Sequence, residues 1–217
     1  QAVADINTAC TSGVSHISHY QLTIETNTYF HKHTPVLPEN DLIWEMQTQC
    51  QDILAEHHYR QYEVSAYARQ GPGYNRQCEH NLNYWKFGDY IGIGAGAHGK
   101  LTQRHNPDKA DDKLDIIRRW KHRQPQQYIE QAISGDAISG SEQLAQQDII
   151  FEFLLNALRL KTGSSLETFE KHTGLPIDAL RESVRDIDPA LLSIDEDTVK
   201  TTEKGFLFLN DILQQLL

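Results

Sequence analysis

The sequence predicts an α/β protein, with a parallel sheet or barrel in its first part and a small winged-helix-like α+β domain in its last part. In residues 1–140, segments with alternating apolar residues and segments with helical spacing follow one another, as in repeated βα units. From residue 141 onward the pattern changes to helix, helix, helix, hairpin, helix, which is the order of a winged-helix unit. We therefore predict a domain boundary near Gly140, with domains at 1–140 and 141–217.

The first domain is expected to contain three strands and a long helix. Residues 19–25 alternate with period two and predict a strand, whereas residues 42–54 carry apolar side chains at helical spacing. Residues 61–69 predict a second strand, and the sequence Gly-Pro-Gly at 71–73 ends it. The apolar run at 90–93, followed by glycines, predicts a third short strand.

The second domain is expected to begin with an amphipathic helix over residues 150–158, for which Gly163 is a suitable C-cap. A capping-box pattern at 164–167 predicts the start of the next helix, and Gly174 its end. The remaining predicted elements are a third helix at 177–184, a two-stranded wing at 191–194 and 199–201, and a final helix at 206–216.

The charge balance argues against nucleic acid as a partner. With 20 Lys and Arg against 30 Asp and Glu, the formal net charge is −10, and anionic lipid is disfavoured for the same reason. Residues 141–217 alone carry a net charge of −7. A domain that must neutralise phosphates needs the opposite sign, so we expect the winged-helix-like domain to serve packing or partner binding.

One segment, residues 100–123, is locally basic, with eight Lys or Arg against four Asp. The favoured interpretation is a solvated loop with its return strand and a surface turn at 107–112. The alternative is a set of cations that face an anionic ligand, such as the propionates of a tetrapyrrole. Both interpretations remain open at the level of the sequence.

The cysteines indicate a reducing compartment. Cys10, Cys50 and Cys78 are odd in number and widely spaced, without a CxxC pair, so a disulfide framework or a cysteine-based zinc site is not expected. The most apolar stretch, at 149–160, contains charged residues and is too short to span a bilayer. No signal peptide is visible either, and a cytoplasmic location is expected.

Two segments could carry chemistry. At 80–85 the sequence HNLNYW combines an imidazole that could bind iron with two rings that could pack on a macrocycle; an ordinary histidine beside core aromatic residues is the alternative. At 90–99 the sequence YIGIGAGAHG matches only weakly the dinucleotide-binding fingerprint. Its small residues either let a ligand approach the backbone or form a tight turn, and His98 would lie at the carboxyl end of a strand.

Taken together, several segments resemble the radical S-adenosylmethionine (SAM) family of oxygen-independent coproporphyrinogen III oxidases, above all its HemW-type heme-chaperone subgroup. The segments are HYQLTIE (19–25), YEVSAYAR (62–69), HNLNYW (80–85), FGDYIGIGAGAHG (87–99) and TTEKGFLFLN (201–210). The resemblance implies an incomplete TIM-like barrel, a [4Fe-4S] cluster with bound SAM, and a smaller C-terminal domain.

The family holds its cluster with a CxxxCxxC motif, which this sequence lacks. We therefore expect the chain, which opens with Gln1, to be a C-terminal fragment with the last barrel strands, without cluster ligands and inactive alone. By resemblance, His80 is the heme-binding histidine. The resemblance also assigns four positions to SAM binding, namely Leu22, Gly94, Ala97 and His98.

The resemblance predicts that the intact protein is a cytoplasmic heme chaperone that delivers heme to heme enzymes. The alternative is an enzyme, an oxygen-independent coproporphyrinogen III oxidase that converts coproporphyrinogen III to protoporphyrinogen IX in porphyrin biosynthesis. A third possibility is a partner-binding module whose barrel remnant is structural. The HNxxYW pattern at 80–85 favours heme handling over porphyrinogen decarboxylation.

Overall fold

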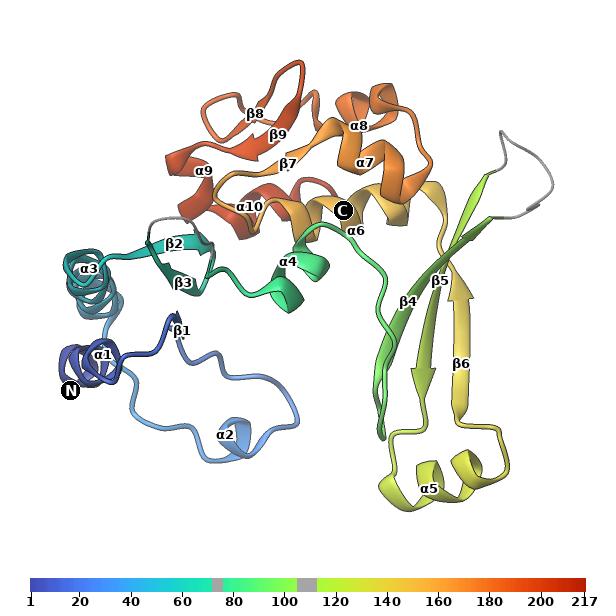
Figure 1. Cartoon of the computed structure of the whole chain (residues 1–217), viewed down its shortest axis with the longest axis horizontal. Helices are drawn as coiled ribbons and strands as arrows, with labels where there is room; N and C mark the ends of the chain where they lie inside the picture. Colours follow the sequence, from blue (N-terminus) through green and yellow to red (C-terminus); the bar gives the residue numbers. More distant parts are fainter. Residues whose placement is uncertain (72–75, 105–112) are drawn as a thin grey trace. The chain divides into compact units, whose positions relative to one another are not determined.

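The computed structural model describes residues 1–71, 76–104 and 113–217 (Figure 1). Within them the chain forms two compact units, Gln1–Cys78 and Glu79–Leu217. Helices and three three-stranded sheets are mixed, as expected for the predicted class. Gly140 lies inside the second unit, and the predicted division at that residue remains a prediction.

The first unit packs helices against a three-stranded antiparallel sheet with strand order β1-β3-β2. Its elements are α1 (Ala2–Thr11), β1 (His16–Ser18), α2 (Tyr29–Lys32), α3 (Asn40–Glu56), β2 (Tyr59–Glu63) and β3 (Ala66–Arg69). The core joins Ile6 and Cys10 of α1 to Cys50 and Leu54 of α3. Helix α3 confirms the helix predicted at 42–54, and its apolar residues Cys50, Ile53 and Leu54 pack into this core, whereas Leu42 near its start is exposed.

The strand predicted at 19–25 is wrong. Strand β1 ends at Ser18, and the side chains of Tyr20 and Leu22 are 68% and 44% exposed. The reason lies in the partner strand, since Ser18 is paired with Ala66, the first residue of β3. Only one more hydrogen bond, from the His19 amide to the Ser65 carbonyl (2.8 Å), continues the pairing, so the alternating residues beyond it have no strand opposite them.

The single strand predicted at 61–69 is a hairpin. Strands β2 and β3 are joined by two residues, Val64 and Ser65, and a bulge interrupts their register between Gln61 and Glu63. So short a connection allows only antiparallel pairing. Every pairing between named strands in the described ranges is antiparallel, so the parallel pairing expected from βα repeats is not found there. Residues 72 and 73 of the predicted break lie outside the described residues.

The second unit begins with a helix and a long three-stranded antiparallel sheet of order β4-β5-β6. Its first elements are α4 (Glu79–Trp85), β4 (His98–Arg104), β5 (Leu114–Lys121), α5 (Pro125–Ile133) and β6 (Ile138–Gln143). Helix α5 lies at the end of this sheet and connects β5 to β6 (Figure 1). The basic segment at 100–123 supplies β4 and its return strand β5, and the predicted turn at 107–112 falls outside the described residues.

The strand predicted at 90–93 is also wrong. Only Tyr90 forms an isolated bridge, to Lys100, and the side chains of Ile91 and Ile93 are 76% and 85% exposed. A Cβ atom on Gly92 would lie 2.3 Å from the carbonyl oxygen of His98. The apolar residues at 90–93 therefore belong to a turn that packs closely against the start of β4.

The rest of the second unit follows the predicted order with two differences: one extra strand is present, and the final helix predicted at 206–216 is two helices that meet at Phe208. Its elements are α6 (Gln146–Ala157), β7 (Ser164–Ser165), α7 (Leu166–Thr173), α8 (Ile177–Val184), β8 (Leu192–Ile194), β9 (Thr198–Thr201), α9 (Glu203–Leu207) and α10 (Leu209–Gln214). The predicted wing is the β8–β9 hairpin, and β7 pairs with β9 on its other side. The fully buried core of this part includes Phe153 and Leu154 of α6 and Phe169 of α7.

Of the three predicted caps, Gly174 is confirmed, and the one expected from the pattern at 164–167 is displaced by one residue, because Ser165 and not Ser164 caps α7 and Thr168 stands where the capping box needs Glu. The Ser165 hydroxyl accepts a hydrogen bond from the Thr168 amide at the start of α7 (3.1 Å), and Gly174 ends this helix in the left-handed conformation. Gly163, in contrast, is not a C-cap, since α6 ends at Ala157. Gly163 instead has a φ of +66° at the entrance of β7, where a Cβ atom would lie 2.1 Å from the carbonyl oxygen of Val199.

We predict that Gly163→Ala destabilises the protein more than Gly135→Ala. Both glycines have positive φ, which costs a residue with a Cβ atom roughly 1–2 kcal/mol. Only the Cβ atom at position 163 would also meet backbone, whereas position 135 is open; overpacking adds about 1–3 kcal/mol. Urea unfolding of both variants measures the difference, and equal losses would contradict the close approach.

Candidate functional site

The motif HNLNYW lies on α4 and presents His80 to solvent. Tyr84 follows one helical turn later, and the centroids of the two rings are 4.8 Å apart in an edge-on arrangement. The Tyr84 ring in turn packs against the ring of Tyr90, at 4.5 Å between centroids. An accessible imidazole thus stands beside the ring of Tyr84, which in turn contacts Tyr90. This arrangement is compatible both with an iron ligand and with an ordinary histidine beside aromatic residues.

Trp85 lies on a different face of α4 from His80, because five residues correspond to well over one turn. Its indole ring packs beneath the Arg159 guanidinium, whose carbon is 4.5 Å from the ring centroid. The sequence suggested that both rings of the motif could accompany the imidazole. In the structure Tyr84 does so, whereas Trp85 faces a residue that follows α6.

The end of α4 is fixed by a tight backbone turn. The amide of Phe87 donates to the carbonyl of Tyr84 (2.9 Å), and that of Gly88 to the carbonyl of Asn83 (2.7 Å). Phe87 has a φ of +59°, which is uncommon for a residue other than glycine. Its buried ring lies edge-on to Phe153 of α6, at 6.0 Å between centroids. Core packing therefore holds the strained turn that terminates the motif helix.

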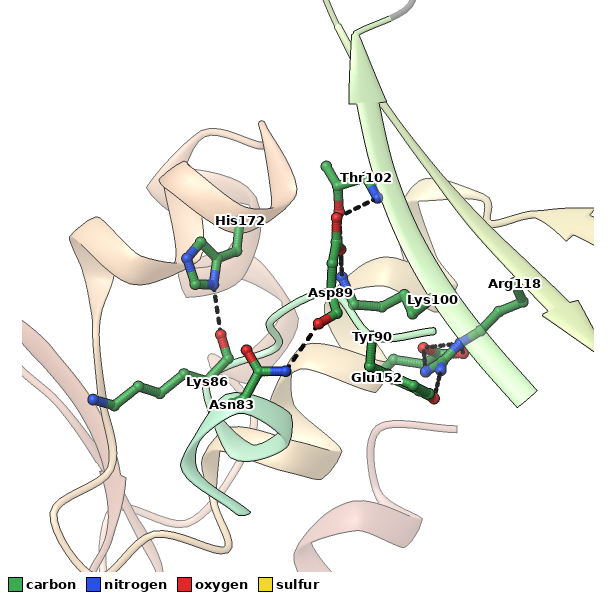
Figure 2. Close-up of polar contacts among 9 residues, drawn as sticks. All are labelled: Asn83, Lys86, Asp89, Tyr90, Lys100, Thr102, Arg118, Glu152 and His172. Carbon is green, nitrogen blue, oxygen red and sulfur yellow. Dashed lines mark hydrogen bonds and ion pairs between the residues drawn. The ribbon is translucent and has the colours of Figure 1, made fainter. Parts of the chain in front are cut away.

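Asp89 joins this turn to β4 (Figure 2). Its carbonyl oxygen accepts a hydrogen bond from the Asn83 side chain on α4 (2.9 Å). Its carboxylate accepts from the ammonium of Lys100 (2.8 Å) and from both the amide and the hydroxyl of Thr102 (2.7 Å each). One aspartate therefore connects the motif helix with the first residues of the sheet.

Lys100 is the buried partner in this contact, with 1% of its side chain exposed. Its ammonium nitrogen also lies 4.2 Å from the centroid of the Phe87 ring, a cation–π contact. Burial lowers the pKa of Lys100, although the neighbouring Asp89 favours the charged form. Burial alone would raise the pKa of Asp89, but the hydrogen bonds from Lys100 and Thr102 outweigh it and lower the pKa of this carboxyl.

A second ion pair ties Tyr90 to α6 (Figure 2). The Tyr90 hydroxyl accepts a hydrogen bond from the Arg118 guanidinium, which also pairs with the carboxylate of Glu152. Burial disfavours the charge of Arg118, but Glu152 raises the pKa of the guanidinium above its ordinary value. The sequence left open whether the cations of the basic segment face an anionic ligand. Two of them, Lys100 and Arg118, face carboxylates of the protein itself.

Three of the residues predicted to contact SAM lie together before and at the start of β4. The amide of Gly94 donates to the hydroxyl of Tyr128 on α5 (3.2 Å), and that of Ala97 to the carbonyl of Gly94 (3.2 Å). The His98 ring stacks near that of Trp120 on β5, at 6.3 Å between centroids. A strand follows these glycines, whereas the dinucleotide fingerprint requires a helix, so that weak match is excluded.

Leu22, the fourth predicted SAM position, lies in the first unit, in the segment after β1 that forms no strand. The side-chain and backbone contacts at these four positions neither require nor exclude an adenosine ligand. Their assignment to SAM remains a prediction.

The described residues do not fit a four-iron cluster. Among them no group of three or more His, Cys, Asp or Glu side chains could hold a metal ion. Cys10 and Cys50 are buried in the core of the first unit, where burial raises the pKa of both thiols and disfavours the thiolate that binds iron. An exposed imidazole such as that of His80, in contrast, suits an axial ligand of heme iron.

The residues that fix the motif helix were missed by the sequence analysis. Asp89 gave no signal of its own, Lys100 and Arg118 appeared only as members of the basic segment at 100–123, and Glu152 only as a charge that interrupts the apolar stretch at 149–160. The nearest sequence signal was the position of Asp89 directly after Phe87 and Gly88, where a turn is expected.

We predict that Asp89→Asn lowers the stability at neutral pH by about 2 kcal/mol, because it leaves the buried ammonium of Lys100 without its carboxylate. The pKa of Asp89 is lowered from 3.8 in the folded protein. Its contribution is therefore complete above pH 3.8 and is lost as the pH falls further.

Urea unfolding at pH values from about 2 to about 7, a range that extends below the ordinary pKa of a carboxyl group, measures this dependence. The variant should show a flatter loss of stability in acid than the parent, while exposed Asp136→Asn serves as the control. Parallel pH profiles for Asp89→Asn and the parent would contradict the role of this carboxylate.

Comparison with known proteins identifies the relatives of this chain. Residues 144–208 match the family model described as the HemN C-terminal domain. The whole chain is 40% identical to the heme chaperone HemW of Escherichia coli (strain K12) and 38% identical to that of Haemophilus influenzae, and in each case covers 53% of the relative. The chain therefore spans about half the length of the curated relatives it matches.

A solved structure shows the same fold. The coproporphyrinogen III oxidase HemN from Escherichia coli, described as a radical SAM enzyme, aligns with a TM-score of 0.66 over 97% of this chain and 50% of its own, at 15% identity. No helix in the described ranges is long and apolar enough to cross a membrane. The resemblance inferred from the motifs is confirmed: over its full length the chain is similar to HemW heme chaperones, its residues 144–208 match the HemN C-terminal domain, and it shares the fold of HemN.

Proposed function

We propose that this chain is the heme-binding part of a heme chaperone, in which His80 is the axial ligand and from which heme passes to heme enzymes. The observation that carries the proposal is the exposed imidazole of His80 beside the ring of Tyr84 on an anchored helix. A neutral imidazole is a good ligand of heme iron. The names of the similar HemW proteins support the same function.

The surroundings of His80 suit a flat, largely apolar ligand. Tyr84 and Tyr90 offer ring surface, and the exposed side chains of Ile91 and Ile93 follow directly in the chain. Aromatic and aliphatic side chains commonly line the faces of a macrocycle. Because α4 is held by Asp89 and the Phe87 turn, the imidazole would be presented on a rigid support.

We also propose the finer architecture and cofactors that the family implies. Residues 1–140 would contribute to an incomplete TIM-like barrel, and residues 141–217 would form the winged-helix-like domain. SAM, which supplies radical chemistry when bound to a [4Fe-4S] cluster, would contact Leu22, Gly94, Ala97 and His98. Since the described residues do not fit the cluster, no chemical step is assigned to it.

A second candidate function is oxygen-independent oxidation of coproporphyrinogen III, favoured by the shared fold with HemN. An anaerobic assay of the intact protein for protoporphyrinogen IX, run beside a heme titration, separates the two functions. Heme binding without product supports the chaperone, whereas turnover of coproporphyrinogen III would establish the enzyme.

We predict that His80→Ala weakens heme binding by the intact protein at least about tenfold, or about 1.4 kcal/mol, because the iron loses its imidazole. The fold should survive, since the side chain is exposed. Titration followed by the Soret band measures the affinity. His31→Ala, which removes another exposed imidazole from α2, is the control; the proposal fails if both variants bind heme as the parent does.

We predict that the chain does not bind duplex DNA at physiological salt, despite the helix order of its last part. Residues 141–217 have a net charge of −7, and α8 carries Asp178 and Glu182 beside Arg181. Phosphate binding requires the opposite sign. Fluorescence anisotropy with a labelled duplex tests this, and submicromolar binding with a steep salt dependence would overturn it.

A further inference from the structure

The side chain of Tyr90 is held at both ends (Figure 2). Its ring packs against the ring of Tyr84, at 4.5 Å between centroids, and its hydroxyl accepts a hydrogen bond from the Arg118 guanidinium. The Nε of Arg118 donates to both carboxylate oxygens of Glu152, at 3.0 and 3.2 Å. Because the side chains of this ion pair are only 21% and 20% exposed, solvent screens it less than a pair on the open surface, and it is a firm support for the hydroxyl.

One end of this series of contacts is fixed by the core. Glu152 belongs to α6, and the two residues that follow it, Phe153 and Leu154, are completely buried. Side chains in a close-packed core keep one arrangement because neighbouring atoms fill the space around them. The contacts that run from Glu152 through Arg118 to Tyr90 therefore start at a rigid part of the second unit.

The other end of the series is the imidazole of His80. The rings of Tyr84 and His80 meet edge-on, with centroids 4.8 Å apart and planes at 79°, on the same face of α4 and one turn apart. His80 is exposed, and exposed side chains change rotamer within picoseconds to nanoseconds. A ring that is itself fixed beside the imidazole removes part of this freedom, so even an exposed histidine can keep one orientation.

We propose that Tyr90 is a positioning residue, which acts through Tyr84 on the orientation of the His80 imidazole. The inference rests on the proposed function of His80 as the iron ligand. A ligand must point its nitrogen at the metal, and an imidazole that is already oriented loses less side-chain entropy when it binds. The Tyr90 hydroxyl, held by Arg118, thus contributes to heme affinity without contact with the iron.

The experiment centres on Tyr90→Phe in the intact protein, because this change keeps the ring and removes only the hydroxyl that Arg118 holds. The first readout is the NMR resonance of the His80 ring Cε1–H without heme, identified by its absence in His80→Ala. Its position depends on the Tyr84 ring, since an aromatic ring shifts the resonances of nearby protons. The second readout is a heme titration with the EPR spectrum of the ferric complex, whose g-values depend on the orientation of the axial imidazole.

We expect Tyr90→Phe to shift the His80 resonance, to change the g-values and to weaken heme binding about threefold, the effect of one side chain that is no longer oriented in advance. Tyr90→Leu, which also lacks the ring, should shift the resonance further and weaken heme binding about tenfold. Tyr67→Phe is the matched control. It removes a hydroxyl that accepts a hydrogen bond from the Gln51 side chain (3.2 Å) in the first unit, and it should change neither readout.

An unchanged His80 resonance in both Tyr90 variants would overturn the positioning role, whether or not heme binds. Equal shifts in Tyr67→Phe and Tyr90→Phe would overturn it too, because the effect would then be a general loosening of the fold. A shifted resonance with unchanged heme affinity and g-values would contradict the contribution to heme binding. If His80→Ala binds heme as the parent does, the iron ligand is wrong, and the heme-free resonance still decides the positioning role.

Discussion

The contact between Lys100 and Asp89 is the interaction on which the candidate site depends. An ammonium that is almost completely buried requires a partner, and here the partner is the residue that ends the strained turn after α4. Asp89 can both end the turn and pair with Lys100 only if the turn keeps its shape. In that shape Phe87 has a left-handed backbone conformation, and its ring lies against the ammonium of Lys100. The buried charge of Lys100 on β4 thus holds Asp89, and Asp89 in turn anchors the helix that carries His80.

Other contacts support the same segment from α6. Arg118 connects Tyr90 to Glu152, and Phe87 packs on Phe153. In addition, the His172 ring of α7 contacts the carbonyl oxygen of Lys86 (2.6 Å). The motif helix has only seven residues and would not be stable alone, so these tertiary contacts are what maintain it.

The features that were predictable from sequence are local ones. Helix α3, the start of α7 to within one residue, and the cap at Gly174 depend on spacing and backbone preference within a few residues, and they were found. The strand expected at 19–25 failed because strand formation needs a partner, and the partner strand begins only at Ala66. Lys100 could not be predicted to be buried, since its burial depends on Asp89 and Phe87 being brought beside it by the turn.

The same division applies to the site. The motif and its resemblance pointed to His80, but whether an aromatic ring stands beside it depends on helix geometry, which assigns Tyr84 to that role and Trp85 to Arg159. The resemblance in turn supplied positions such as Leu22 that no described contact supports.

The most direct test of His80 as the heme ligand is an experimental structure of the heme-loaded intact protein. We expect the iron to be bonded to an imidazole nitrogen of His80, and iron bound through any other residue would contradict the account.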